Sequence, residues 1–383
     1  MRRILVAGLA LCAATAAIAA DAPKGISSIL FWTPQQQIDG YKAVEKTFPV
    51  RMVKRGTTVY PLPHAARQAD IRYTFQGKPF DSDAFVKANH LSGLLVIKDG
   101  KVVVEKYALG RKPEDRWVSF SVTKSITALL VGAAIKDGAI KSLDSNVADY
   151  IPHLKGSAYD GVTVRQLLTM TSGVKWNENY ADPNSDVARF ALGKPGPDGE
   201  SPIVAYMAKL PREAKPGTKF SYKTGESDLI GILVQHATHK HLADYLSQKI
   251  WAPFGMERDA NWMTDLSGAE IGGCCLSMTL RDYGRVGLFV MGGARGVVPA
   301  DYLAAATRQQ VLSDFAGMGY GYQWWIPAAG TYEAVGIFGQ SIYVNPKEKL
   351  VIVTNSAWPE ADAGKYYAVT DAYQKAAIEA LKD

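Results

Sequence analysis

The chain has 383 residues, of which 47% are hydrophobic and 21% charged. This composition supports one large domain or two to three lobes around a sizeable core, and it excludes a wholly disordered chain. The net charge of +6 is spread along the sequence without a run of five basic residues, so we expect no nucleic-acid partner.

The first residues are typical of a secretory signal. Arg2 and Arg3 precede an apolar run that ends in small residues at Ala19 and Ala20. Charge, apolar core and small residues in this order predict a signal peptide over residues 1–20. We therefore expect a periplasmic or secreted protein. The apolar segment is too short for a membrane span, so none is expected after signal cleavage.

Beyond that segment, the cysteines are the adjacent pair Cys274 and Cys275. Neighbouring cysteines rarely bridge, because a vicinal disulfide strains the peptide between them. We expect two unbridged cysteines that behave as small buried hydrophobic groups. A disulfide framework and a cysteine-based zinc site are both excluded on this basis.

The predicted elements begin after an irregular N-terminal extension, residues 21–90, which contains apolar side chains that could wrap a domain. Residues 91–107 hold two β-branched runs around Asp99-Gly100, which predicts a β-hairpin. Residues 121–136 carry apolar side chains at helical spacing, and Gly138 can end that helix.

The rest of the chain is mostly helical and then returns to strands. Helical patterns fill a region from about 140 to 290, at 164–171, 186–192, 203–210, 227–236, 242–250 and 279–291. Strand patterns follow at 332–344 and 350–355, and a terminal helix at 365–381. Strands at both ends around a helical middle predict an α+β fold: one antiparallel sheet built from the two ends of the chain, flanked by helices, with an inserted helical region.

A serine and a lysine stand at the start of the best predicted helix, in Ser121-Val-Thr-Lys124. The i, i+3 spacing puts the hydroxyl and the amine on one helix face. The helix N-terminus favours a developing alkoxide, and the same field with partial burial favours a neutral amine that accepts a proton. The competing interpretation is an N-cap serine with a solvated lysine.

Two later segments of the chain add to this serine–lysine pair. Pro216-Gly217 leads through a short aromatic strand to Tyr222-Lys-Thr224 and an apolar helix, and Gly336-Ile337 stands at the head of a strand. With these segments the chain resembles the serine β-lactamase and penicillin-binding superfamily, over roughly residues 90–382. It looks closest to the branch of class C-like enzymes, family VIII esterases and 6-aminohexanoate-dimer hydrolase.

The resemblance implies a β-lactamase/transpeptidase-like domain over 91–383 and a role for each matching residue. Ser121 becomes the nucleophile, Lys124 its base or base partner, and Tyr222 the phenol that passes the proton to the leaving group. The backbone N–H groups of Ser121 and Ile337 become the oxyanion hole. The nylon-oligomer branch has a mobile tyrosine that Tyr180 would match, and the alternative for Tyr180 is an ordinary loop aromatic. Thr224, Gly336 and Gln340 are further candidate substrate contacts.

The chain departs from the family pattern in two places. A Y-x-N motif has become Tyr222-Lys-Thr224, which replaces an amide by a hydroxyl. The K-T-G triad before the last strands is missing, because Ala334-Val335-Gly336 offers no cation for a β-lactam carboxylate. Efficient β-lactamase or D-Ala-D-Ala carboxypeptidase activity is therefore not expected.

Two other features have ordinary alternatives. His236, His239 and His241 resemble a ligand cluster, but they lie at a helix end, and we expect a solvated turn. The tryptophans at 324–325, and Trp176, could line an acyl or amine pocket or belong to the core. We expect no metal and no cofactor.

The sequence thus predicts a secreted serine hydrolase that cleaves carboxylic esters or short linear amides through an acyl-enzyme. The substrate is a small molecule, and the oligomeric state is open. A non-catalytic acyl sensor or cell-wall-binding module on the same fold is the alternative from another class.

Overall fold

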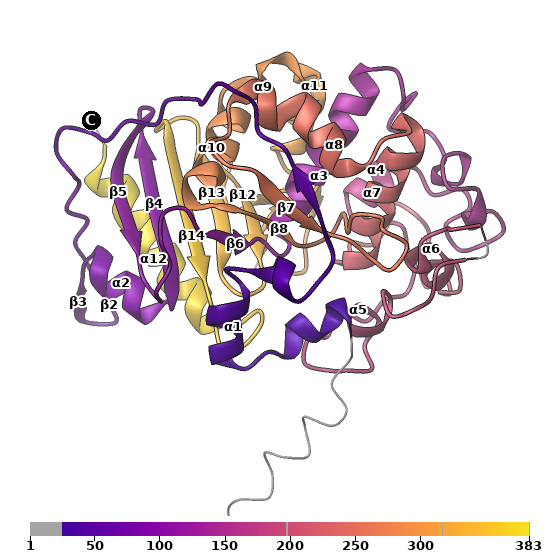
Figure 1. Cartoon of the computed structure of the whole chain (residues 1–383), viewed down its shortest axis with the longest axis horizontal. Helices are drawn as coiled ribbons and strands as arrows, with labels where there is room; N and C mark the ends of the chain where they lie inside the picture. The colour runs from indigo at the N-terminus through magenta and orange to yellow at the C-terminus, as the bar shows by residue number, and fades with distance from the viewer. Residues whose placement is uncertain (1–24, 197, 316, 383) are drawn as a thin grey trace, which may run out of the picture.

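The computed structural model describes residues 25–382 apart from 197 and 316 (Figure 1). The predicted signal peptide, residues 1–20, lies outside the described residues. Among the helices in the described part, none combines the length and the hydropathy needed to cross a bilayer.

An eight-stranded antiparallel sheet forms the centre of the fold, in the order β5-β4-β14-β13-β12-β11-β10-β9 (Figure 1). Its strands are β4 (Leu91–Lys98), β5 (Lys101–Tyr107), β9 (Val311–Leu312), β10 (Gly319–Tyr320), β11 (Trp325–Ile326), β12 (Tyr332–Gly336), β13 (Gln340–Asn345) and β14 (Leu350–Ser356). The predicted hairpin is β4–β5, and β4 pairs with β14. The prediction of one sheet built from both ends of the chain is confirmed.

Alternation along β4 divides the core between the two faces of this sheet. Leu94 and Val96 pack in one cluster with Tyr373 of α12 (Gly364–Ala380), next to α2 (Ser82–Ala88). Leu95 and Ile97 pack in the opposite cluster, against α10 (Leu280–Met291). The predicted terminal helix therefore covers one face, while the helical region covers the other.

The helical region is centred on α3 (Val122–Lys136), whose side chains are buried from Val122 to Ala134. It packs against α7 (Thr224–Thr238) and β12. The other helices are α1 (Pro34–Gly40), α4 (Val164–Leu168), α5 (Asp186–Arg189), α6 (Pro202–Met207), α8 (Leu242–Leu246), α9 (Ala252–Phe254) and α11 (Ala300–Ala306). This packing fixes the start of α3 beside the start of α7.

The sequence patterns did not predict several of the strands. A second antiparallel sheet has the order β1-β7-β8-β6, and β2 pairs with β3. The bounds are β1 (Val50–Val53), β2 (Tyr73–Phe75), β3 (Lys78–Phe80), β6 (Arg116–Val118), β7 (Ala260–Met263) and β8 (Leu276–Thr279). Every residue of β7 and β8 is buried, so neither strand shows the alternation of a half-buried strand.

The predicted strand over 332–344 is two strands, β12 and β13, joined by a reversal. Gly339 has a φ of 88°, and its N–H donates to the Gly336 carbonyl at 3.0 Å. A Cβ on Gly339 would lie 2.3 Å from the Trp358 ring. Glycine is required here both for the positive φ and for the close approach.

The expectation of unbridged cysteines is wrong. Cys274 and Cys275 form a disulfide, with their Cα atoms 3.6 Å apart. The chain turns sharply at this point: Cys274 N–H donates to the Ile271 carbonyl at 3.3 Å, and Cys275 has a φ of 76°. This local bend, which is not visible in the sequence, brings the two sulfurs together.

The N-terminal extension packs on the domain through aromatic side chains. After the 3₁₀ helix η1 (Ile26–Phe31), the Trp32 ring stacks on Phe48 at 5.6 Å. Tyr41 is fully buried, with its ring 5.6 Å from Trp117 and 5.1 Å from Phe120. The extension therefore reaches the segment that leads into α3.

Candidate active site

Ser121 occupies the N-cap position of α3, three residues after β6 ends. Its position matches the N-cap interpretation, but its φ of −67° and ψ of −6° are helical rather than extended, and its side chain makes no capping hydrogen bond. The residue is 8% exposed. The Ser121 hydroxyl is thus held at the helix N-terminus and left free for chemistry.

The residue before it has a strained backbone. Phe120 has a φ of 45°, which is unfavourable for a bulky side chain and costs on the order of 1 kcal/mol. Its ring packs between Tyr41 at 5.1 Å and Phe338 at 4.9 Å. These contacts offset the strain, and they fix the direction in which Ser121 enters the helix.

Lys124 is buried beside the serine, with 1% of its surface exposed. Its Nζ lies 2.8 Å from Ser121 Oγ, 3.1 Å from Thr224 Oγ1 and 2.7 Å from the Gly273 carbonyl oxygen. Burial lowers the pKa of the ammonium to about 8, against a smaller opposing effect of the Glu178 and Asp228 carboxylates. This shift increases the fraction of Lys124 that is neutral near physiological pH.

The acceptors around Lys124 determine where its lone pair points. The Gly273 carbonyl can only accept a hydrogen bond. The Thr224 hydroxyl gives its own proton to Glu178, so toward Lys124 it can also only accept. A neutral amine has two N–H groups, and these two acceptors engage both. The remaining lone pair faces Ser121 Oγ, which is the geometry required of a general base.

Glu178 links the groups around the lysine. Its carboxylate accepts from the Thr224 backbone N–H at 2.9 Å, from the Thr224 hydroxyl, from the Trp176 indole and from the Tyr180 hydroxyl at 2.7 Å. Sequence reasoning did not single it out. A weak signal exists: residues 176, 178 and 180 alternate, and in an extended segment such residues point to the same side.

Tyr222 completes the predicted set. Its ring centroid lies 5.2 Å from Lys124 Nζ, and Trp325 stacks on it at 5.6 Å. Burial, and next the charge of Glu178, raise the pKa of the phenol above its ordinary value, while a hydrogen bond with Ser121 acts in the opposite direction. The phenol therefore keeps its proton at neutral pH. The structure brings Ser121, Lys124 and Tyr222 together.

Two backbone donors are available beside the serine. Among the described residues, neither the Ser121 N–H nor the Ile337 N–H donates to a protein acceptor. Gly336 lets β12 approach, because a Cβ there would lie 2.7 Å from the Ser119 carbonyl oxygen. Gln340 is fully buried, and its amide donates to the Ser356 carbonyl at 2.8 Å and spans the turn at Phe338. That amide supports the loop that carries Ile337.

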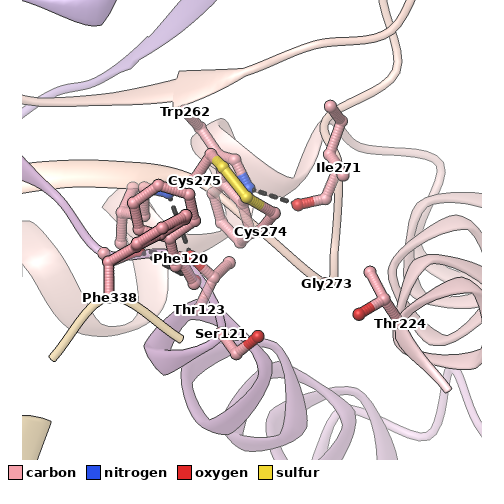
Figure 2. The surroundings of a disulfide bond; sticks show 12 residues. Phe120, Ser121, Thr123, Thr224, Trp262, Ile271, Gly273, Cys274, Cys275 and Phe338 are labelled. Carbon is pink, nitrogen blue, oxygen red and sulfur yellow. Dashed lines mark hydrogen bonds between the residues drawn. A yellow bond between two sulfur atoms is a disulfide. The ribbon is translucent and has the colours of Figure 1, made fainter. Parts of the chain in front are cut away.

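A cavity opens over these groups. Ser121, Thr224, Tyr180 and Ile337 line it together with Gly273 and the disulfide. Figure 2 shows the disulfide near Trp262, whose indole donates to the Ile271 carbonyl at 2.9 Å, and the Ser121 and Thr224 hydroxyls on the side of Gly273. Within the described part of the chain, no side chain that lines this cavity carries a charge. The hydroxyl of Ser121 thus faces an apolar space.

The other candidates lie elsewhere. Trp324 is fully buried, with its ring 5.4 Å from Tyr332, so it belongs to the core. His236 and His241 face different carboxylates, those of Glu200 at 3.9 Å and Glu270 at 3.8 Å. These two histidines therefore do not share one partner.

The chain is similar in sequence to several known proteins. The family model described as Beta-lactamase matches residues 83–374. The 6-aminohexanoate-dimer hydrolase of Paenarthrobacter ureafaciens is 31% identical over 296 residues, which cover 72% of this chain and 74% of that protein. The flp protein of Staphylococcus aureus strain N315 is 24% identical over 45% of this chain and 35% of its own length.

Solved structures show the same fold. A Bacillus anthracis structure named after 6-aminohexanoate-dimer hydrolases superposes with a TM-score of 0.79 at 23% identity, covering 89% of this chain and 93% of that one. EstCE1, a hydrolase with promiscuous acyltransferase activity, superposes with a TM-score of 0.62 at 17% identity, covering 76% of this chain and 98% of its own.

Proposed function

Because the chain belongs to the beta-lactamase family and is a hydrolase of that superfamily, we propose that it cleaves carboxylic esters or short linear amides through an acyl-enzyme on Ser121. One observation carries this proposal. The Gly273 carbonyl and the Thr224 hydroxyl accept from Lys124, so the lone pair of the neutral amine points toward Ser121 Oγ at 2.8 Å.

In the first step, neutral Lys124 takes the Ser121 proton as Oγ attacks the substrate carbonyl carbon. The carbonyl electrons move to oxygen, and the Ser121 and Ile337 N–H groups stabilise this oxyanion by on the order of 3 kcal/mol for each donor. The α3 N-terminus adds to the same stabilisation.

In the second step, the tetrahedral intermediate collapses and the bond to the leaving alcohol or amine breaks. Tyr222 gives its proton to the leaving group and regains one from the Lys124 ammonium, so the proton taken from Ser121 replaces the one that leaves with the product. Water then attacks the acyl-enzyme. The same groups act in reverse: they take a proton from this water and give one to Ser121 Oγ as the acyl–oxygen bond breaks.

The cavity favours uncharged substrates. None of the described residues that line it is cationic, so a β-lactam or D-Ala carboxylate has no partner there. We expect esters to be hydrolysed best, linear amides next and β-lactams least. The sequence over 1–20 supports a periplasmic or secreted location, which the N-terminal residue of the exported protein would test.

A hydrolysis panel tests the function. It contains p-nitrophenyl esters, a linear aminohexanoate amide, a D-Ala-D-Ala peptide and nitrocefin. The wild type should turn over the esters, and Ser121→Ala should lose turnover with an unchanged circular dichroism spectrum. Full ester hydrolysis by Ser121→Ala contradicts the assignment. Stable labelling of Ser121 without turnover would instead favour the acyl-sensor alternative.

A further inference from the structure

One wall of the cavity over Ser121 comes from the N-terminal extension. Ile26, Ser27, Ile29 and Leu30 of η1 line it. The family model begins to match only at residue 83. This wall therefore lies outside the part of the chain that the family model matches.

The η1 segment is anchored on both sides of the cavity. Ile29 is 3% exposed and belongs to the hydrophobic cluster that contains Phe120, Ile271 and Ile337. On its other side, η1 contacts α5, whose Val187 also lines the cavity. The segment thus bridges two walls and limits the depth of the space above Ser121.

The lining beside η1 is apolar as well. It includes Met263, Ile271 and the Cys274–Cys275 disulfide. Tyr222, the proposed proton donor to the leaving group, is not among the described residues that line this cavity. The leaving group therefore lies toward Tyr222, and the cavity is left for the acyl part of the substrate.

We propose that η1 is a specificity-determining wall, and that the enzyme acts on esters whose acyl group is an uncharged, apolar chain of limited length. The inference rests on the proposed function. Leu30 is half-buried and lines the cavity, so its size can be changed with less risk to folding than that of Ile29. One methylene more or less in such a pocket changes discrimination by about tenfold or more.

The experiment compares p-nitrophenyl esters from acetyl to octanoyl on the full chain, as wild type, Leu30→Ala and Leu30→Trp. Leu30→Ala should raise the ratio of kcat/KM for octanoate over butyrate about tenfold, and Leu30→Trp should lower it similarly. Leu312→Ala is the matched control, because Leu312 is 64% exposed, and its ratio should equal that of the wild type.

A second measurement does not depend on turnover. Alkyl fluorophosphonates of two chain lengths react with the serine, forming the Oγ–P bond as fluoride leaves, and the ratio of their labelling rates should follow the same order among the variants. If the wild type is labelled and the ratio of the two labelling rates changes less than twofold in both Leu30 variants, the proposal that η1 determines specificity is refuted. The proposed hydrolase function then still stands. If Ser121 neither labels nor turns over esters, both proposals fail.

Discussion

Replacing Glu178 by glutamine should move the pH dependence of the reaction downward. Lys124 acts as a base only when neutral, so activity rises as the pH passes its pKa, which burial sets at about 8. Glu178 opposes that effect of burial and raises the pKa. Removing its charge lets the pKa of Lys124 fall further, and the rising limb of the profile then moves to lower pH.

The magnitude follows from the contacts. The Thr224 hydroxyl touches both Lys124 Nζ, at 3.1 Å, and the Glu178 carboxylate. Two hydrogen-bond lengths put the charges within about 6 Å of each other. At an effective dielectric constant of about 20, their interaction is about 3 kcal/mol, which corresponds to about two pKa units.

The assay is kcat/KM against pH for a p-nitrophenyl ester, followed from pH 5 to 10. The value of kcat/KM at the high-pH plateau should also fall, because one glutamine oxygen cannot accept from all the donors that Glu178 satisfies. Glu213→Gln is the matched control, since Glu213 pairs on the surface with Lys219 at 3.1 Å. If the rising limb of the pH profile stays in place or moves to higher pH in Glu178→Gln, the proposed role of Lys124 is refuted.

Two further predictions concern the groups that hold Lys124. Thr224→Val removes an acceptor for the amine, so kcat/KM should fall by about 10²-fold, whereas Thr224→Ser should retain most activity on the same ester; equal losses would contradict the lone-pair argument. The disulfide follows Gly273, whose carbonyl holds Lys124 at 2.7 Å, so reduction by a phosphine should lower kcat/KM by about tenfold or more and reoxidation should restore it. A Cys274→Ala, Cys275→Ala double variant should be insensitive to the reductant. If thiol titration confirms that the wild-type disulfide is reduced and activity is still unchanged, the coupling between the disulfide and Lys124 is disproved.

The elements predicted from the sequence are those with long local patterns. The hairpin at Asp99-Gly100 has both turn residues at positive φ, 51° and 75°, as that dipeptide prefers. The helix from 122 to 136 has fifteen residues and a following glycine at a φ of 77°. The strands β7 and β8 have only four residues each and are buried throughout. Local periodicity cannot reveal them, because pairing with distant strands stabilises them.

The site shows the same division between local and distant information. Ser121 and Lys124 are one helical turn apart, so their spacing already places them together. The hydroxyl at Thr224, by contrast, looked like the loss of a family amide. It can take the place of that amide only if something orients its proton, and Glu178 does so from 46 residues away. A threonine at this position therefore requires an acceptor that a residue-by-residue comparison of the motif does not include.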